Sequence, residues 1–143
     1  MSAAVRVHVT HSFTSPPQAV FDALSEHENL GPVFGARITR LRDGETSRNG
    51  VGSARSLKIA PVLPAFVETT TVSQPPTLIE YRITSGLLPI HGHHGVQRLT
   101  ARPDGGTDLD YTIAFDSRVP GLARIVGLGL QHTVAKGIPR LLP

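Results

Sequence analysis

The sequence has no cysteine, so it can form neither a disulfide framework nor a thiolate metal site. It has no tryptophan, and aromatic residues make up only 5% of the chain. A nucleic-acid-binding module usually has more aromatic side chains, interleaved with its basic ones. No apolar run is long enough to span a bilayer. We therefore expect no nucleic-acid partner and no integral membrane segment.

The basic residues do not form a cluster. The net charge is +3, and lysine occurs only at Lys58 and Lys136 among the 14 basic residues. The arginines are scattered along the chain, which disfavours a dedicated nucleic-acid surface. Residues 1–13 alternate apolar and polar and lack the continuous apolar segment of a signal peptide. We therefore expect a cytoplasmic location.

A length of 143 residues, with 39% hydrophobic and 17% charged residues, is typical of one globular domain spanning 1–143. Apolar residues at every second position over 5–13 predict a first strand. Ser15 as an N-cap, followed by Pro16-Pro17, predicts the start of a helix. A second short helical segment is broken at Gly31-Pro32.

The middle of the chain predicts six more strands, separated by turns rich in glycine, proline and aspartate. The predicted ranges are Ala36–Arg42, Gly52–Ile59, Ala65–Ser73, Thr77–Thr84, His91–Ala101 and Thr107–Asp116. Their short connections favour an antiparallel sheet. Apolar residues then recur every four positions from Leu122 to Ile138, which predicts a long helix with one apolar stripe.

This order of elements resembles the helix-grip fold of the START-related (SRPBCC) superfamily. GVGSAR, from Gly50 to Arg55, resembles the Gly-x-Gly-x-x-Arg motif that opens the third strand in the polyketide cyclase/dehydrase-like branch. Glu68, in FVETTTV, stands where that branch often has a glutamate. Residues 93–115 resemble its last two strands, joined by a Gly-Gly-Thr turn. Phe21 departs from the pattern, because the first helix of the branch often carries tryptophan there.

The resemblance implies an α+β fold in which a curved seven-stranded antiparallel sheet wraps around the long C-terminal helix. Two short helices lie between the first and second strands, and a cavity lies between sheet and helix. An empty cavity of a few hundred Å³ would cost about 7 kcal/mol. That rivals the whole stability of such a domain, about 5–15 kcal/mol. We therefore expect a ligand or ordered water inside.

Arg55 and Glu68 are a candidate buried ion pair. If the third and fourth strands form a hairpin, Leu57 lies opposite Glu68, and Arg55 lies diagonal to Glu68 on the same face. A slip of one residue, or a bulge, would send both charged side chains outward instead. The sequence leaves both arrangements open.

Three histidines lie within four residues, at His91, His93 and His94. Side chains alternate between the two faces of a strand. If Leu99 points inward, His91 and His93 also point inward and His94 points outward. The opposite parity, or a bulge at the neighbouring glycines, would exchange or mix these faces. We favour the first arrangement because it leaves Arg98, the hardest of these residues to bury, in solvent.

The histidine cluster has four interpretations: a metal site, an acid/base group, polar hooks that orient a ligand, or a solvated strand. A metal would need further ligands, and the sequence offers only Glu68 and the distant His11 or His132. A histidine has a pKa suited to acid/base chemistry. We favour polar side chains that orient a ligand in a mostly apolar pocket, with His93 as the best candidate. We expect no metal or other cofactor. His27 and His132 are expected to face solvent.

The leading hypothesis is binding of a hydrophobic or aromatic, partly oxygenated small molecule, lipid or polyketide-like, by a monomer or homodimer. The expected ligand-binding residues are Arg55, Leu57, Glu68, Tyr81, His91, His93, Tyr111 and Ile113. The resemblance also suggests a cyclase/dehydratase-type enzyme, in which His93 or His91 moves a proton and Arg55 polarises a carbonyl. A third hypothesis is a chaperone-activator-like or stress-response interaction module with a vestigial cavity.

Overall fold

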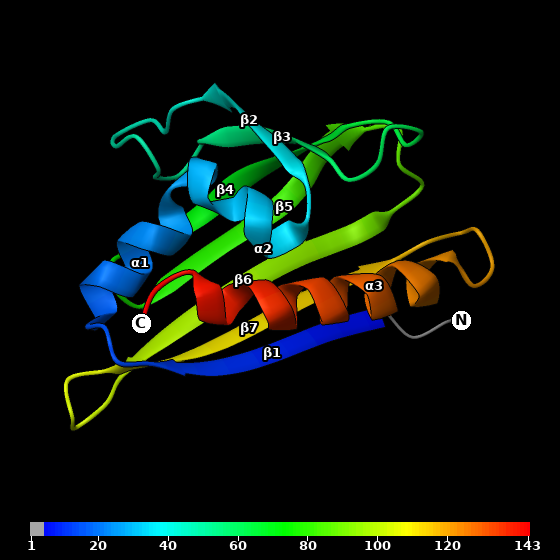
Figure 1. Cartoon of the computed structure of the whole chain (residues 1–143). Coiled ribbons are helices and arrows are strands. Elements are labelled where there is room, and N and C mark those ends of the chain that lie inside the picture. The colour runs from blue at the N-terminus through cyan, green and yellow to red at the C-terminus, as the bar shows by residue number, and fades with distance from the viewer. Residues whose placement is uncertain (1–4) are drawn as a thin grey trace.

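The structure is a computed structural model that describes residues 5–143 (Figure 1). A seven-stranded antiparallel sheet wraps around one long helix, and two short helices cover one end of the sheet. The elements are β1 (Val5–Phe13), α1 (Pro17–Ser25), the 3₁₀ helix η1 (His27–Asn29), α2 (Leu30–Phe34), β2 (Arg37–Arg42), β3 (Ala54–Lys58), β4 (Phe66–Gln74), β5 (Leu78–Gly86), β6 (His91–Ala101), β7 (Thr107–Asp116), α3 (Leu122–Gly137) and the 3₁₀ helix η2 (Ile138–Arg140).

The strand order across the sheet is β1-β7-β6-β5-β4-β3-β2, and all neighbouring strands are antiparallel. The prediction of a helix-grip fold is therefore confirmed. β6 and β7 have the predicted bounds, whereas β3 is shorter than predicted at both ends. No helix within residues 5–143 combines the length and the hydropathy needed to cross a bilayer.

The core forms where the alternating strands meet the apolar stripe of α3. In β7, Leu109, Tyr111, Ile113 and Phe115 are all buried, while the residues between them are more exposed. On the facing helix, Val134 is fully buried, as is Ile138 just beyond the helix end. Burial of alternate residues on a strand and of every fourth residue on a helix is what the two periodicities require.

The helix α1 begins differently from the prediction. Its N-cap is Pro16, which makes no side-chain capping hydrogen bond. Ser15, the predicted cap, instead donates its hydroxyl to the carbonyl oxygen of Pro143 at 2.9 Å, and its backbone N–H donates to the same oxygen at 3.0 Å. The end of the chain is thereby held beside the start of α1 (Figure 1).

Gly95 allows the ring of Tyr81 to lie across β6. A Cβ atom at Gly95 would overlap that ring, and both residues are buried. We expect Gly95→Ala to lower the free energy of unfolding by about 1–3 kcal/mol, because overpacking forces side chains off their rotamers. The matched control is Gly129→Ala on α3, where a Cβ meets nothing within 4 Å.

Gly129→Ala should instead stabilise the protein by up to about 1 kcal/mol, because alanine favours the helix interior. Urea unfolding of both variants gives the two free energies. Equal effects of the two substitutions would contradict the close contact of Gly95 with Tyr81.

Candidate functional site

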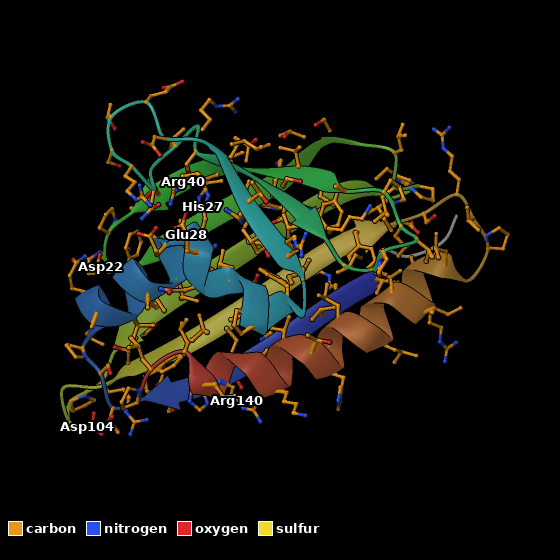
Figure 2. All side chains as sticks on the ribbon, turned by 45° about the horizontal axis from the view of Figure 1, so that its top comes forward. Asp22, His27, Glu28, Arg40, Asp104 and Arg140 are labelled. Carbon is orange, nitrogen blue, oxygen red and sulfur yellow. The ribbon has the colours of Figure 1, made fainter. Side chains whose placement is uncertain are left out.

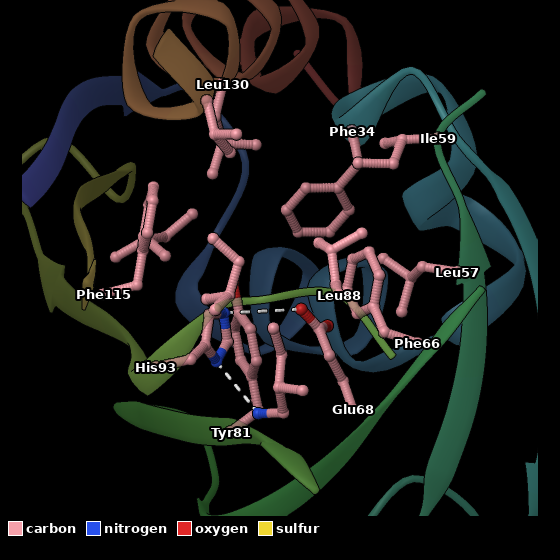
Figure 3. Close-up of a pocket in the computed structure, with 14 residues that line it drawn as sticks. Phe34, Leu57, Ile59, Phe66, Glu68, Tyr81, Leu88, His93, Phe115 and Leu130 are labelled. Atoms are coloured by element: carbon pink, nitrogen blue, oxygen red, sulfur yellow. Dashed lines mark hydrogen bonds and ion pairs between the residues drawn. The ribbon is translucent and has the colours of Figure 1, made fainter. Parts of the chain in front are cut away.

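A small cavity lies between the inner face of the sheet, α2 and α3 (Figure 3). Its volume is about 60 Å³. Most of its lining is aliphatic or phenylalanine side chains, and three residues bring polar atoms to it. The lining residues are Phe34, Leu57, Ile59, Phe66, Glu68, Tyr81, Ile83, Leu88, Ile90, His93, Ile113, Phe115, Val126 and Leu130.

The cavity is smaller than the sequence-based expectation of a few hundred Å³. A volume of about 60 Å³ costs about 1.5 kcal/mol if unfilled. That is a minor part of the stability of such a domain, which is about 5–15 kcal/mol. The energetic reason to expect a ligand or ordered water in a large cavity therefore does not apply, because large side chains from α2, α3 and the β5–β6 connection line a much smaller space.

Arg55 and Glu68 form the buried ion pair, which was one of the two arrangements left open. They are direct cross-strand partners, with Leu57 opposite Phe66, so the predicted register was wrong by two residues. The Arg55 Nε and Nη2 groups both donate to Glu68 Oε1, at 3.2 and 2.9 Å. Both side chains are only 4% exposed, so the pair lies in the core.

Burial raises the pKa of Glu68, and the positive charge of Arg55 opposes this rise. Because Arg55 bonds only Oε1, the second carboxylate oxygen, Oε2, points toward β6. Glu68 thus presents one oxygen to its structural partner and the other to the cavity side (Figure 3).

His27 holds the far side of the Arg55 guanidinium. Its Nε2 atom accepts from Arg55 Nη1 at 3.5 Å, and Arg55 also lies 5.0 Å from the ring centre of Tyr81. Burial, and then the charges of Arg55 and Arg40, lower the pKa of His27 to about 4. The prediction that His27 faces solvent was wrong, because η1 turns the ring inward over β3.

An ion network covers this histidine from outside (Figure 2). Arg40, on β2, donates from Nε to Glu28 Oε1 and from Nη2 to Glu26 Oε1, each at 3.0 Å. The hydrogen bond from Arg40 is the main cause of the lowered pKa of Glu28. The network ties η1 to β2 and so fixes the position of His27 against Arg55.

His93 lies on β6 with its ring against the cavity. The backbone N–H of Ile83 donates to its Nδ1 at 3.0 Å, so the neutral ring carries its proton on Nε2. That Nε2 lies 3.6 Å from Glu68 Oε2 (Figure 3). Burial, and then the charge of Arg55, lower the pKa of His93 to about 4. At neutral pH His93 is therefore an uncharged donor facing a carboxylate oxygen.

Tyr81 and Tyr111 join their hydroxyl groups in a short hydrogen bond under the cavity. Burial is the largest cause of the raised pKa of each phenol. Behind them the side-chain oxygen of Gln97 is buried without a hydrogen-bond partner among the described residues. The two tyrosines are thus uncharged at neutral pH, and their bonded hydroxyl groups lie beside the Glu68–His93 pair.

The three clustered histidines separate. His93 faces inward and His94 faces outward, where its Nε2 contacts Glu80, and both placements were predicted. His91 is exposed and does not line the cavity, so its inward placement was wrong. The pairing of β6 with β7 shifts between His91 and His94, and Gly92 has a φ of 63°, so a bulge turns His91 away.

Five of the predicted ligand-binding residues line the cavity: Leu57, Glu68, Tyr81, His93 and Ile113. Arg55 and Tyr111 lie behind them and bond to Glu68 and Tyr81, respectively. The sequence reasoning missed Phe34, Phe66, Leu88 and Ile90 as lining residues. Phe66 follows from parity with Glu68, whereas the other three lie on short segments without a usable periodicity. No group of three or more potential metal ligands occurs within residues 5–143.

Several solved structures share this fold. The Zhui aromatase/cyclase from Streptomyces sp. R1128 is 16% identical, with a TM-score of 0.71 over 96% of this chain and 95% of that one. Norcoclaurine synthase from Thalictrum flavum is 14% identical, with a TM-score of 0.69 over 99% and 96%. TTHA0849 from Thermus thermophilus is 16% identical, with a TM-score of 0.74 over 95% of each chain. Identities this low establish similarity of fold alone.

No curated protein matches the sequence significantly. The sequence profile of one family does match, over residues 4–141, which is nearly the whole chain. That family is described as polyketide cyclase / dehydrase and lipid transport. The match over nearly the whole chain shows that this chain belongs to the polyketide cyclase/dehydrase and lipid transport family.

Proposed function

We propose that this protein binds a hydrophobic or aromatic small molecule that carries a hydroxyl group, in the cavity between the sheet and α3. The observation that carries the proposal is the pairing of His93 Nε2 with Glu68 Oε2 on the wall of an otherwise apolar cavity. Their separation of 3.6 Å is too long for a good hydrogen bond. A ligand hydroxyl accepts from His93 and donates to Glu68, which satisfies both groups.

The ligand must enlarge the cavity to bind. Pockets for drug-sized ligands measure about 300–1,000 Å³, against about 60 Å³ here. Leu88 and Ile90 project into the cavity from the β5–β6 connection, which is bounded by Gly86 and Gly92 with φ of 132° and 63°. Rotation about these two glycines would move both apolar side chains outward at the cost of only the terminal pairings Gly86–Phe66 and His91–Asp116, and this is the expected route of expansion.

A series of para-alkylphenols tests the proposal. We expect affinity to rise about fourfold for each added CH₂ group, until the cavity stops expanding, because each buried CH₂ contributes about 0.8 kcal/mol. The matching alkylbenzenes, which lack the hydroxyl, should bind at least about tenfold more weakly. Isothermal titration calorimetry of the full chain gives both comparisons.

Two leucine substitutions assign the binding to this site. His93→Leu should remove the preference for phenols over hydrocarbons, whereas His91→Leu, on the exposed part of the same strand, should leave it unchanged. Leu130→Trp, which fills the cavity, should abolish binding of the whole series. Failure of every phenol to bind, or an equal loss in the two histidine variants, would rule the proposal out.

A cyclase/dehydratase-type reaction is the second candidate, and the convergence of Glu68 and His93 favours it. On a β-hydroxy ketone, ionised Glu68 would take the proton next to the carbonyl, while His93 Nε2–H stabilises the enolate oxygen. Glu68 would then return that proton to the departing hydroxide, giving an enone and water. In this scheme Arg55 is a positioning residue, because Glu68 and His27 engage it behind the cavity wall.

An aromatic β-hydroxy ketone is a direct probe, because its conjugated product absorbs in the near ultraviolet. Glu68→Gln should abolish turnover. His93→Leu should lower it by about 10²–10³-fold, the usual effect of losing one oxyanion donor. If the unaltered protein binds the phenols but does not convert the β-hydroxy ketone, the reaction is ruled out and only the binding function remains.

A further inference from the structure

Exposed apolar side chains gather on the segments that enclose the cavity. Among the large apolar residues that are exposed, all but Leu41 and Val51 lie on the β3–β4 connection, the β5–β6 connection, or the segment from the end of β7 into α3. We call these residues the rim. They are Val62, Leu63, Leu87, Val119, Ile125 and Leu128. Val62 and Leu87 are 89% and 85% exposed, which is extreme for aliphatic side chains.

The segments of the rim meet at one end of the molecule. Ile59, Leu88 and Val126 line the cavity, and each lies on or directly beside one of the three segments. The hydroxyl of Ser117 also donates to the carbonyl oxygen of Pro89, which joins the β7–α3 and β5–β6 connections. Figure 1 shows these connections and the start of α3 together at the right-hand end. The rim is therefore one surface.

Basic residues predominate around the rim, although Asp116, which ends β7, lies beside Val119 and Arg124. Residues 117–143 include Arg118, Arg124 and Lys136 but no aspartate or glutamate, and the β3–β4 connection directly follows Lys58. Arg124, Leu128, His132 and Lys136 recur every four residues, and all are exposed, so they share the solvent-facing side of α3. Binding to an anionic lipid surface strengthens with the apolar area that is buried and with the attraction of basic side chains to the headgroups, and this face offers both.

We infer that the rim docks on the surface of an anionic lipid bilayer. Its aliphatic side chains enter the boundary between headgroups and acyl chains, and Lys58, Arg118 and Arg124 contact the lipid headgroups. Val126 and Leu130, on the opposite side of the same helix, line the cavity. Docking therefore brings the cavity wall close to an apolar phase. This surface role is separate from the identity of any molecule that the cavity binds.

Cosedimentation of the full chain with vesicles tests the inference without any cavity ligand. The vesicles contain either phosphatidylcholine alone or phosphatidylcholine with phosphatidylserine at about two to one. The protein should sediment with the anionic vesicles and remain in solution with the neutral ones. Raising the salt concentration should weaken the binding, because screening reduces attraction between exposed charges.

Four variants separate the rim from general charge and hydrophobicity. Ile125→Glu combined with Leu128→Glu should lower the partition coefficient at least tenfold, and Arg124→Gln should lower it about fivefold. The controls are Leu41→Glu combined with Val51→Glu, an equal change outside the rim, and Arg98→Gln on the outer face of β6. Both controls should bind like the unaltered protein. All these residues are exposed, so circular dichroism should show an unchanged fold.

Three results would overturn the inference: no sedimentation with anionic vesicles at low salt, equal losses in rim and control variants, or a doubled mass in solution that the rim substitutions abolish. The last would assign the rim to a second copy of the chain. Titration of the rim variants with an alkylphenol in lipid-free buffer keeps the two proposals apart, because cavity binding there does not depend on the rim.

Discussion

Arg55→Met should lower the free energy of unfolding by about 3–5 kcal/mol, the largest effect we expect from a single substitution in this chain. Methionine fills much of the same volume but donates no hydrogen bond to Glu68. The carboxylate, only 3% exposed, then stays in the core without its charge partner. Breaking a buried pair costs more than the pair contributes, because the remaining charge keeps its desolvation penalty. Urea unfolding at neutral pH measures the loss.

The double variant Arg55→Met, Glu68→Met distinguishes this mechanism from a packing defect. It should recover most of the lost stability, since apolar residues often replace a buried ion pair at little cost. The matched surface control is Arg102→Met, whose partners Asp104 and Asp108 are exposed. That change should cost less than about 1 kcal/mol. If the double variant is no more stable than Arg55→Met, the unpaired carboxylate is not the cause.

The pH dependence of the single variant adds an independent check. Without Arg55, nothing opposes the effect of burial, which already raises the pKa of Glu68 in the intact protein. A carboxyl group with a raised pKa in the folded state takes up its proton there first, so acid favours folding. Arg55→Met should therefore regain stability as the pH falls through the raised pKa of Glu68.

The sheet and its inner face could be predicted from the sequence because alternation has a period of two. Leu57, Tyr81 and Ile113 were assigned inward from parity alone, and all three line the cavity. The pairing of Arg55 with Glu68 was one of two options. Parity predicts that they share a face, but the predicted register differed from the observed one by two residues. Local pattern thus determines faces more reliably than pairing.

The errors concern features that depend on contacts distant in sequence. A bulge at the glycines of β6 was an alternative that the sequence left open and we did not favour, and nothing in the sequence shows that Gly92 takes the positive φ and exposes His91. His27 looked like a solvated residue because its environment is made by Arg55, which lies on β3 and is distant in sequence. The cavity volume depends on how far Phe34 and Leu130 reach into it, and side-chain packing of this kind has no sequence period.

Acid should destabilise this protein in two separable stages, and the first comes from its buried histidines. His27 and His93 each have a pKa lowered from 6.5 to about 4 in the folded state. The unfolded chain takes up each proton near pH 6.5, before the folded one does, so protonation favours unfolding. The stability that each neutral histidine retains at pH 7 is lost progressively as the pH falls from 6.5 toward 4.

Each histidine accounts for a loss of about 3 kcal/mol over that range, because one pKa unit corresponds to about 1.4 kcal/mol. The loss from both is comparable with the whole stability of many domains of this size. Glu68 opposes it in part, because its raised pKa favours the folded state in acid. A second, smaller stage lies below about pH 4.5, because the exposed Glu28, whose pKa Arg40 lowers in the folded state, takes up its proton first in the unfolded chain.

Two substitutions that preserve hydrogen bonding assign the first stage. In His27→Gln the amide oxygen can replace the Nε2 that accepts from Arg55, and in His93→Asn it can replace the Nδ1 that accepts from Ile83. In each variant the free energy of unfolding should change less steeply with pH between pH 6.5 and 4. The slope should fall by about 1.4 kcal/mol per pH unit, which is the contribution of one proton. His132→Gln, at an exposed position of α3, is the control and should leave the curve unchanged. A loss of slope in both variants would show that folding depends on both rings staying neutral. Parallel curves for the unaltered protein and all three variants would instead show that the core holds neither histidine uncharged.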